Sequence, residues 1–463
     1  MKNICKYILL LLILLSLQSC FVARNYERPE IVNEAYFRTD SIARDSATIA
    51  TVSWRELFTD TRLVAYIEEG LANNIDIRIA LEQMRIAEAY LKQGKAGYLP
   101  SLNGTVRYTH QELSANSQFG GLFSSLDQYE ASASLSWEAD IWGKIRSSKR
   151  ASGAAYLQTV AAHKAVKTAL IANIAVTYYQ LLSLDEQIRI TEQTIENREN
   201  SLEITQALKQ AGSVTEVGVK QTEAQLYTAQ GILIDLQNRL RLLENTLSVL
   251  LGKAPASLTR SSLEEQEITT PLRIGVPVQL LRNRPDIIAA EYELINAFEL
   301  TNVARSHFYP SLTLTATAGF QSLDLAQLFN TNSLFASVIA GLTQPIFNRR
   351  QIRTEYEASR ARQEQARLYY RQAFLTASKE VSDALYSYEA ATNKIEIKEK
   401  EYEAYELAAG YSEELLNNGL ANYLEVLTAR ENALNSSLSL IGARYEQLRS
   451  VVELYEALGG GWQ

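Results

Sequence analysis

The feature that most limits the possible folds of this chain is a seven-residue hydrophobic repeat in two very long segments. Such a repeat keeps one narrow apolar seam facing a partner helix, as in coiled coils. Its positions are Leu170, Ile174, Thr177, Leu181, Leu184, Ile188, Thr191 and Ile195, and then Val381, Leu385, Tyr388, Thr392, Ile395 and Glu399. Only 8 prolines occur in 463 residues, so long helices are predicted over 55–97, 144–250, 280–305 and 350–458. A helix over 145–209 would be roughly 100 Å long, which excludes a compact globule.

Four other segments alternate apolar and polar residues, which predicts β-strands. They are 102–108, 130–141, 311–321 and 336–342. Two interpretations are open, namely membrane-spanning strands or a soluble sandwich whose polar faces meet water. Aromatic residues near the ends of these runs favour the membrane, where a barrel wall carries an aromatic girdle at each interface. They are Tyr98, Trp142, Tyr309 and Phe347 where strand meets helix, and Phe119, Phe123, Tyr129, Phe329 and Phe335 near the other ends.

Four strands cannot close a barrel, and an open edge in hydrocarbon would leave backbone groups unpaired. Several chains must therefore contribute strands. With cyclic symmetry, two chains give eight strands and three give twelve. Polar Ser, Thr, Glu and Asp side chains on the inner face favour the larger number, because it leaves a water-filled lumen.

The first twenty residues are predicted to direct export. Lys2 and Lys6 form a positively charged region before an apolar run over 8–15. This run is too short to span a bilayer as a helix and is typical of a signal peptide. The following Leu17-Gln18-Ser19-Cys20 resembles a bacterial lipobox. Cleavage there would remove Cys5 and leave Cys20 to carry a diacylglycerol anchor. The alternative is a plain signal peptide with a chance cysteine.

The two halves of the chain repeat each other. Tyr98-Leu99-Pro100-Ser101-Leu102 is echoed by Phe308-Tyr309-Pro310-Ser311-Leu312, Ile141-Trp142-Gly143 by Ile346-Phe347-Asn348, Ile145-Arg146 by Ile352-Arg353, and Gln210-Ala211-Gly212-Ser213 by Asn417-Asn418-Gly419-Leu420. Glycine ends a helix and allows a tight turn. Each half is therefore predicted to be a helix, a β-hairpin, and a long helical hairpin that turns at Gly212 or Gly419.

Composition and charge exclude several classes of protein. With 45 Lys+Arg against 53 Asp+Glu, the net charge of −8 argues against a nucleic-acid partner. Two cysteines build no disulfide framework, and His110, His163 and His307 lack ligand spacing, so no metal site is expected. The run Gly459-Gly460-Gly461 has no preceding strand and no following Lys-Ser/Thr, so it resembles no phosphate loop. We expect no catalytic residues and no cofactor beyond the lipid on Cys20.

Short motifs follow one another along the mature chain in a recognisable order. They are Asn25-Tyr26-Glu27-Arg28-Pro29, Trp54, Phe58, Asp60 and Leu63, Asn73-Asn74 with Asp76, Tyr98 to Leu102, Val276-Pro277 with Leu280-Leu281, Arg284-Pro285-Asp286, Ala290-Glu291, and Leu454-Tyr455-Glu456-Ala457-Leu458-Gly459-Gly460-Gly461-Trp462. Together they resemble the TolC-like outer-membrane efflux factors, specifically the NodT-type lipoproteins of tripartite pumps. The resemblance implies a mixed α and β membrane protein. It would be a homotrimer with a twelve-stranded outer-membrane β-barrel, four strands per chain, continuous with a long α-helical coiled-coil periplasmic tunnel.

The chain then divides into eight segments. They are a signal peptide over 1–19, a lipidated segment over 20–54, a first-repeat periplasmic helix over 55–97, a barrel β-hairpin over 98–142, a long periplasmic helical hairpin over 143–255, a linker and second-repeat helix over 256–307, a second barrel β-hairpin over 308–347, and a second long helical hairpin with the C-terminal segment over 348–463.

The resemblance implies an exit duct that passively conducts small molecules such as drugs to the exterior. Its partners would be a periplasmic adaptor, an inner-membrane resistance-nodulation-division transporter and outer-membrane lipid. Two alternatives remain, a duct of the same fold for type I protein secretion and a non-channel coiled-coil envelope lipoprotein. Lipidation and the closing Gly-Gly-Gly-Trp favour the pump over the secretion duct.

The resemblance also places a gate at the periplasmic tip of the second long hairpin. Glu425 lies at the gate acid of relatives, with Asn422 nearby and Thr428 where some relatives carry a second acid. The alternative for Glu425 is a solvated helix-face residue. Ala421 replaces a locking arginine and Gly218 replaces an aspartate. The turns Ala211-Gly212-Ser213 and Asn418-Gly419-Leu420 loosely match adaptor-docking turns, whereas Trp54 and Asp60 are expected to be structural.

Overall fold

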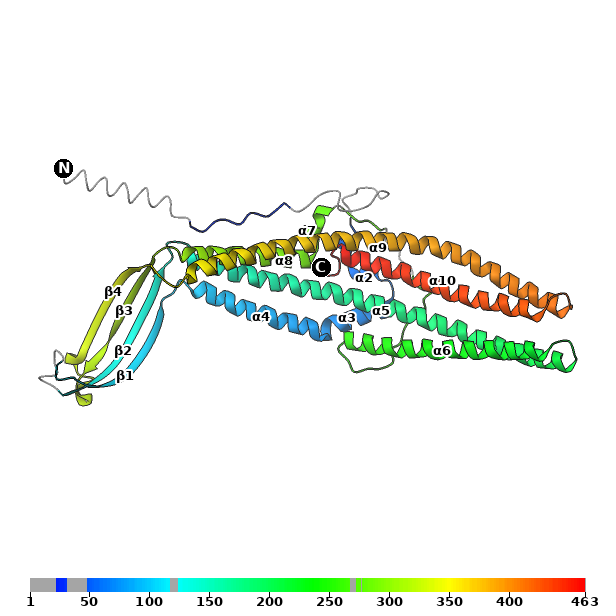
Figure 1. Ribbon diagram of the computed structural model, residues 1–463, viewed down its shortest axis with the longest axis horizontal. Coiled ribbons are helices and arrows are strands. Elements are labelled where there is room, and N and C mark those ends of the chain that lie inside the picture. The colour runs from blue at the N-terminus through cyan, green and yellow to red at the C-terminus, as the bar shows by residue number, and fades with distance from the viewer. Residues whose placement is uncertain (1–21, 31–47, 117–123, 267–271, 276, 463) are drawn as a thin grey trace. The chain divides into compact units, whose positions relative to one another are not determined.

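The computed structural model describes residues 22–30, 48–116, 124–266, 272–275 and 277–462 (Figure 1). The signal peptide, Cys20, Phe119, Phe123 and Val276 lie outside these ranges, so the predictions made for them stay predictions. The chain forms two compact units. The first comprises Met1–Pro29, Met84–Thr159 and Ala290–Tyr370, and the second comprises Glu30–Gln83, Val160–Ala289 and Arg371–Gln463.

Each half of the chain contains short helices, two strands and a pair of long helices. The first half has α2 Trp54–Leu57, α3 Thr61–Asn73, α4 Ile75–Ala96, β1 Ser101–Glu112, β2 Ser125–Ala139, α5 Lys144–Gln210 and α6 Glu216–Leu250. The second has α7 Leu280–Asn283, α8 Pro285–Ser306, β3 Ser311–Ser322, β4 Leu334–Thr343, α9 Gln351–Asn417 and α10 Tyr423–Ala457. The four predicted strands and the predicted long helical hairpins are confirmed.

The helix predicted over 55–97 is broken twice, at residues that cap helix starts. The Asp60 carboxylate accepts from the backbone N–H of Arg62 at 2.8 Å and begins α3. The Asn74 side-chain oxygen accepts from the N–H of Asp76 at 2.9 Å and begins α4. Short polar side chains accept hydrogen bonds from the free N–H groups of a first helical turn, and they are therefore favoured at the residue just before a helix. The helix predicted over 280–305 is likewise divided, because Pro285 starts a new helix.

Most of the predicted heptad positions of α5 are buried, whereas Ile188 and Ile195 are half-buried. Leu170, Ile174, Leu181 and Leu184 are buried, and so is the polar Thr191. The Thr191 hydroxyl donates to the Gln187 carbonyl at 2.7 Å, which satisfies it inside the seam. In α9 the seam is anchored by Val381 and Leu385, whereas Thr392 is exposed. The heptad pattern therefore predicts the buried face well near the middle of each long helix.

The duplication is regular in the structure. The helices α4 and α8 and the strands β1 and β3 differ by 210 residue numbers at both ends, for example Ser101 and Ser311. The pairs α5 and α9, and α6 and α10, differ by 207 at both ends, for example Lys144 and Gln351. The echo of Ile141-Trp142-Gly143 in Ile346-Phe347-Asn348 has an offset of 205, so it is displaced by two residues from the structural equivalence. Similar residue types there misled the sequence comparison.

The chain end is fixed beside the start of α8. The Arg284 guanidinium donates to Asp286 at 2.6 Å, Glu380 at 2.5 Å and the Ala457 carbonyl at 3.0 Å. A Cβ on Gly459, whose φ is 86°, would lie 2.5 Å from the Asn283 backbone, so only glycine fits there. The Trp462 indole N–H donates to the Asn283 carbonyl at 2.9 Å. The C-terminal glycine–tryptophan motif is thus a packing device.

The four strands form one antiparallel sheet in the order β1-β2-β3-β4 (Figure 1). The β1–β2 and β3–β4 pairs are hairpins within each half, and β2–β3 joins the two halves. Within this sheet β1 and β4 are the edges, each paired on one side. The two halves of the chain therefore each supply one hairpin, and the two hairpins lie next to each other in the sheet.

Candidate functional site

The sheet has one apolar face and one polar face. Alternate residues of a strand point to opposite faces. The strand register places apolar side chains opposite apolar ones and polar side chains opposite polar ones. The apolar face carries Leu102, Val106, Tyr108, Ala131, Ala133, Leu135, Leu312, Leu314, Ala316, Ala318, Phe320, Leu334, Ala336, Val338, Ala340 and Leu342. The opposite face carries Asn103, Thr105, Arg107, Glu130, Ser132, Ser134, Ser136, Thr313, Thr315, Thr317 and Ser337. Phe335 and Ile339 are apolar exceptions on the polar face.

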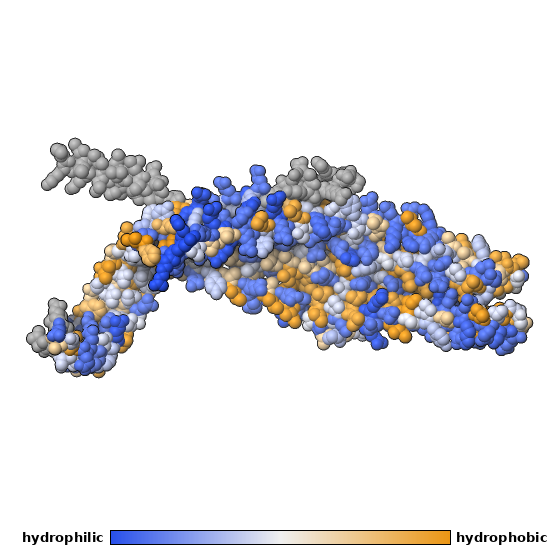
Figure 2. Space-filling model, in the orientation of Figure 1, coloured by the Kyte–Doolittle hydropathy of each residue, from blue (hydrophilic) through white to orange (hydrophobic). Residues whose placement is uncertain are grey.

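No second sheet covers the apolar face within the described ranges. Its side chains stay exposed, with Val338 at 72% and Leu342 at 64%, and Figure 2 shows apolar patches over the strands. The soluble-sandwich alternative is therefore wrong for this part of the chain. An apolar outer face with a polar inner face is the pattern of a strand wall in lipid. Among the helices that the structure describes, none has an apolar stretch long enough to cross a membrane.

Aromatic pairs lie at both ends of the strands. Near the strand ends that join the helices, Trp142 and Tyr309 have ring centroids 5.0 Å apart, and the Trp142 indole N–H donates to the Pro310 carbonyl at 2.7 Å. Near the other ends, Tyr108 stacks on Tyr129 at 5.0 Å. Phe335 was predicted to belong to the aromatic girdle, but it lies on the polar face of the sheet, opposite Gly319.

The second long hairpin turns at Gly419 and restarts at Asn422. Gly419 has φ 69°, and the Leu420 N–H donates to the Leu415 carbonyl at 2.8 Å, which closes a Schellman turn. The first hairpin turns in the same way, since Gly212 has φ 77° and the Ser213 N–H donates to the Leu208 carbonyl at 2.9 Å. Both predicted docking turns, 211–213 and 418–420, are exposed.

The predicted gate residues begin α10. The Glu425 N–H donates to the Asn422 side-chain oxygen at 3.1 Å, and the Asn422 amide donates back to the Glu425 carboxylate at 3.1 Å. Asn422 is therefore the N-cap of α10, and the pair resembles a capping box in which the side-chain amide of the N-cap residue, rather than its backbone N–H, donates to the acid. Asn422, Glu425 and Thr428 are all exposed, and the Thr428 hydroxyl donates to the Leu424 carbonyl at 2.9 Å. Glu425 therefore has a capping role, and its carboxylate also faces solvent. In the first repeat Gly218 occupies the position that corresponds to Glu425, so the start of α6 lacks this acid.

A polar network that sequence reasoning missed ties the four long helices together a few residues beyond the gate. Arg430 of α10 forms an ion pair with Glu413 of α9 and donates to the Ser201 hydroxyl of α5 at 2.5 Å. The neighbouring Glu431 accepts from Gln225 of α6 at 3.3 Å. These residues look like ordinary charged positions of a coiled coil, so only the packing of the two hairpins reveals the network.

The buried Arg198 of α5 completes this network. It donates to the Gln225 carbonyl, and burial lowers the pKa of its guanidinium. Arg198 and Arg430 line a cavity of about 340 Å³. The four helices are thus connected by side chains that would have to separate if the hairpins moved apart.

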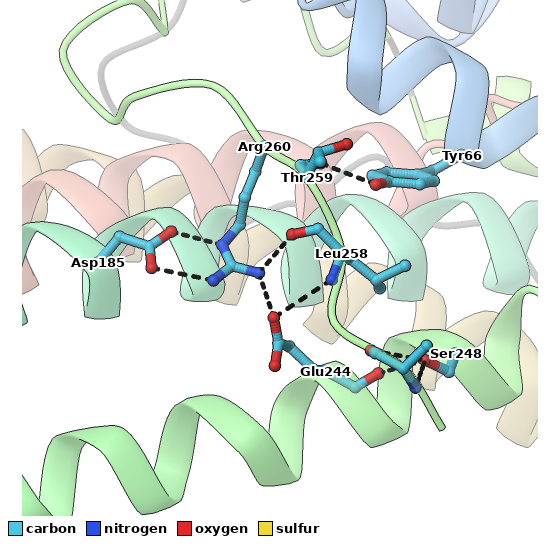
Figure 3. Close-up of polar contacts among 8 residues, drawn as sticks. Tyr66, Asp185, Glu244, Ser248, Leu258, Thr259 and Arg260 are labelled. Carbon is cyan, nitrogen blue, oxygen red and sulfur yellow. Dashed lines mark hydrogen bonds and ion pairs between the residues drawn. The ribbon is translucent and has the colours of Figure 1, made fainter. Parts of the chain in front are cut away.

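A second cluster fixes the linker after α6 to both helices of the first hairpin (Figure 3). Arg260 donates to Asp185 of α5 at 2.5 and 3.0 Å and to Glu244 of α6 at 2.7 Å. Burial alone would lower the pKa of Arg260, but the hydrogen bonds with the two carboxylates outweigh it and raise the pKa. The Tyr66 hydroxyl donates to the Thr259 carbonyl at 2.7 Å. Arg260 therefore holds α5, α6 and the linker as one body.

Asp60 and Trp54 have the structural surroundings expected of them. Besides its capping bonds, the Asp60 carboxylate accepts from the Tyr178 hydroxyl at 2.7 Å and from Gln266 at 3.0 Å. Trp54 is buried under the Arg55 guanidinium. In the described ranges, no group of three His, Cys, Asp or Glu side chains is arranged to hold a metal ion.

The comparisons with known proteins agree with this geometry. The family described as outer membrane efflux protein matches residues 66–253 and 276–460. The solvent efflux pump outer membrane protein SrpC of Pseudomonas putida is 30% identical over 455 residues, covering 97% of each chain. The cation efflux system protein CusC of Escherichia coli O6:H1 is 28% identical over 454 residues, again covering 97% of each. The probable outer membrane lipoprotein SilC of Salmonella typhimurium is 28% identical, covering 97% of this chain and 98% of its own.

Solved structures show the same fold. The outer-membrane channel OprN superposes with a TM-score of 0.87 at 25% identity, covering 95% of this chain and 99% of its own. CusC superposes with a TM-score of 0.83 at 27% identity, covering 96% and 100%. The predicted fold class, four barrel strands and long helical hairpins in each chain of a TolC-like channel, is confirmed.

Proposed function

The chain belongs to the outer membrane efflux protein family and is an outer-membrane efflux channel, and from that premise we propose that three copies form the exit duct of a tripartite efflux pump. The observation that carries this proposal is the sheet, which has an exposed apolar face, a polar face and two free edges. Edges in lipid must be paired. Twelve strands from three copies close a ring around a polar lumen. Crosslinking of the protein in outer-membrane extracts should give a ladder that ends at trimer, and a ladder ending at dimer would contradict the proposal.

The duct conducts small molecules passively, and the energy comes from an inner-membrane resistance-nodulation-division transporter. The relatives named for cation and solvent efflux favour a pump over a protein-secretion duct. The genes beside this one discriminate between the two alternatives. Adaptor and transporter genes of the resistance-nodulation-division type are expected there, whereas an ATP-driven exporter of proteins would favour secretion.

The adaptor docks on the two hairpin turns in this proposal. Both turns are exposed and share one backbone geometry, and Leu420 presents an apolar side chain that is 76% exposed. A photo-crosslinking residue at position 420 should capture a periplasmic adaptor in cells. The same probe at Leu325, an exposed residue in the loop between β3 and β4, should not. Equal capture at both positions would contradict the assignment.

The lipid anchor belongs on Cys20, a few residues before a segment that is held in place. The Arg24 N–H donates to the Asn302 side-chain oxygen at 3.2 Å, and Asn302 donates back to the Arg24 carbonyl at 3.0 Å. Arg28 then forms two bonds of 2.6 Å with Glu291 of α8. Arg24 and Arg28, which follow Cys20 in the sequence, are therefore held against α8. Metabolic palmitate labelling should disappear in Cys20→Ser, and labelling that persisted would reject the lipobox.

Glu425 is proposed to set ion selectivity at the closed end of the duct. Three copies bring three carboxylates together, and charges within a Debye length of roughly 8–10 Å repel one another and attract cations. Replacing Glu425 with glutamine removes the charge and keeps both the backbone N–H that donates to Asn422 and a side-chain oxygen that can accept from the Asn422 amide. The variant should assemble normally and show a reversal potential that moves toward zero under a salt gradient.

Glu216→Gln is the matched control, because Glu216 begins α6 in the other hairpin turn and is paired with Lys209. It should leave the reversal potential unchanged. If Glu425→Gln also leaves it unchanged, the gate acid lies elsewhere.

A further inference from the structure

The turn between β4 and α9 exposes two apolar side chains followed by arginines. Ile346 is 100% exposed and Phe347 is 88% exposed. Arg349, Arg350 and Arg353 come directly after them and are exposed too. The sequence of this turn contains no acidic residue. Uncovered apolar surface and positive charge therefore lie next to each other in one short segment.

The acids that follow on α9 are already paired. Arg350 donates to Glu357 at 2.9 Å, and Glu355 accepts from another arginine of α9 at 3.2 Å. Within the described ranges, the side chains of Arg349 and Arg353 form no ion pair and no hydrogen bond. Two guanidinium groups of the turn are thus free to bind an anion from outside the chain.

The first repeat shows the same turn closed by internal contacts. With the offset of 207, Phe347 corresponds to Asp140 and Arg349 corresponds to Trp142. The Asp140 carboxylate accepts from two backbone N–H groups of α5, both at 2.9 Å, and the Trp142 indole donates to a backbone carbonyl at 2.7 Å. In the second repeat an exposed phenylalanine replaces the acid and an exposed arginine replaces the indole. The second turn therefore lacks these two contacts and carries more positive charge.

The backbone of the turn suits glycine better than arginine. Arg349 and Arg350 have φ 55° and 68°, and Gly143, which corresponds to Arg350, has φ 78°. Residues with a Cβ are disfavoured in this left-handed region, whereas glycine enters it freely. The fold of the turn therefore does not explain the two arginines. Residues held in such backbone conformations cluster at binding sites.

The turn lies just beyond the apolar face of the sheet. On β4 this face ends with Leu342, which is 64% exposed and lies four residues before Ile346. At about 3.3 Å per residue the two are at most roughly 13 Å apart. Gln351 and Glu355 of α9 line a cavity of about 430 Å³ together with side chains of the polar face. Since helical residues are about 100° apart, Arg353 lies on the side of α9 opposite this cavity.

We propose that this turn binds an anionic phospholipid of the leaflet nearest the helices, with Arg349 and Arg353 on its phosphate and Ile346 and Phe347 among its acyl chains. Arginine forms paired hydrogen bonds with phosphate, and basic groups beside a membrane surface attract anionic lipids. A free phosphate ion would use the arginines alone, so the apolar pair favours a lipid. The inference rests on the placement of the sheet in the outer membrane and is independent of the number of copies.

The test variant is Arg349→Gly with Arg353→Gln, which removes both unpaired charges. Glycine suits the φ of 55° at position 349, so the variant should assemble at least as well as wild type. Phosphatidylglycerol is added to the detergent-purified protein, and its binding is followed by native mass spectrometry. The apparent Kd for this lipid should rise at least tenfold in the variant. Phosphatidylcholine, which has no net charge, should bind weakly to both proteins.

Arg367→Gln with Arg371→Gln is the matched control, because it removes the same charge from α9 at least about 20 Å further along the helix. It should bind phosphatidylglycerol like wild type. Phe347→Gln distinguishes a lipid from a free phosphate. It should weaken the binding of phosphatidylglycerol and leave any binding of glycerol 3-phosphate unchanged.

Several results would overturn the lipid site. They are wild-type affinity in Arg349→Gly with Arg353→Gln, an equal loss in the control, and no preference of the wild type for phosphatidylglycerol over phosphatidylcholine. Glycerol 3-phosphate that binds as tightly as the lipid, with Phe347→Gln without effect, would indicate a free-phosphate site instead. Variants that dissociate into single chains would show that the turn is a contact between copies.

The same spectra test the proposed trimer separately, because they give the mass of the wild-type assembly. A wild-type dimer whose phosphatidylglycerol binding depends on Arg349 and Arg353 would reject the trimer and leave this site standing. A trimer without such binding would reject the site and leave the proposed function standing.

Discussion

Replacing Val338 with arginine is expected to remove most of the assembled channel from the outer membrane. Val338 lies in the middle of β4 on the apolar face, with Ser337 on the opposite face. A lipid-facing arginine near the bilayer midplane costs about 2–4 kcal/mol, and a trimer would carry three. The assembled fraction is measured as the heat-modifiable band of outer-membrane extracts on a denaturing gel.

Ser337→Arg is the matched control, because it introduces the same side chain at the next residue. Ser337 is opposite Thr317 on the polar face, where the guanidinium would meet the water-filled lumen. The control should assemble at nearly the wild-type level. If both variants assemble equally well, the apolar face is not in lipid and the assignment of the two faces is wrong.

Arg260→Ala is expected to destabilise the packing of α5, α6 and the linker strongly. The Arg260 and Glu244 side chains are largely buried, so removing the guanidinium leaves the Asp185 and Glu244 carboxylates without their cation. Breaking a buried ion pair in this way costs about 3–5 kcal/mol. The apparent midpoint of thermal unfolding, followed by the loss of helical circular dichroism, should fall markedly. Proteolysis of the linker after α6 should become faster.

The control for this prediction is Arg362→Ala, which removes an exposed pair with Glu355 at 3.2 Å. Exposed pairs contribute about 0–1 kcal/mol, so the midpoint should hardly move. An Arg260→Ala midpoint as close to wild type as that of Arg362→Ala would show that the linker is held by other contacts.

Much of the fold could be predicted because two periods dominate the sequence. The alternation over 311–321 matches β3, Ser311–Ser322, and the glycines Gly212 and Gly419 mark the hairpin turns. Periodicity does not show where a helix is interrupted by a side chain. Asp60 and Asn74 divide the first predicted helix because they cap new starts, and a closer reading of short polar residues would have indicated both breaks.

The polar networks could not be predicted, since their partners are far apart in sequence. Arg260 is 75 residues from Asp185, and Arg430 is 229 residues from Ser201. Each looks like a solvated charge until the helices pack. The capping role of Glu425 is local, and the spacing Asn-x-x-Glu could have signalled it. Its role in the gate is still a prediction.

The most direct test of the account is the conductance of the purified wild-type protein in planar bilayers, with its mass determined in the same preparation. A channel of three copies with polar walls should be trimeric by native mass spectrometry and should conduct ions in discrete steps with cation preference. A monomeric or dimeric protein, or a trimer that left the bilayer insulating in every preparation, would contradict the account.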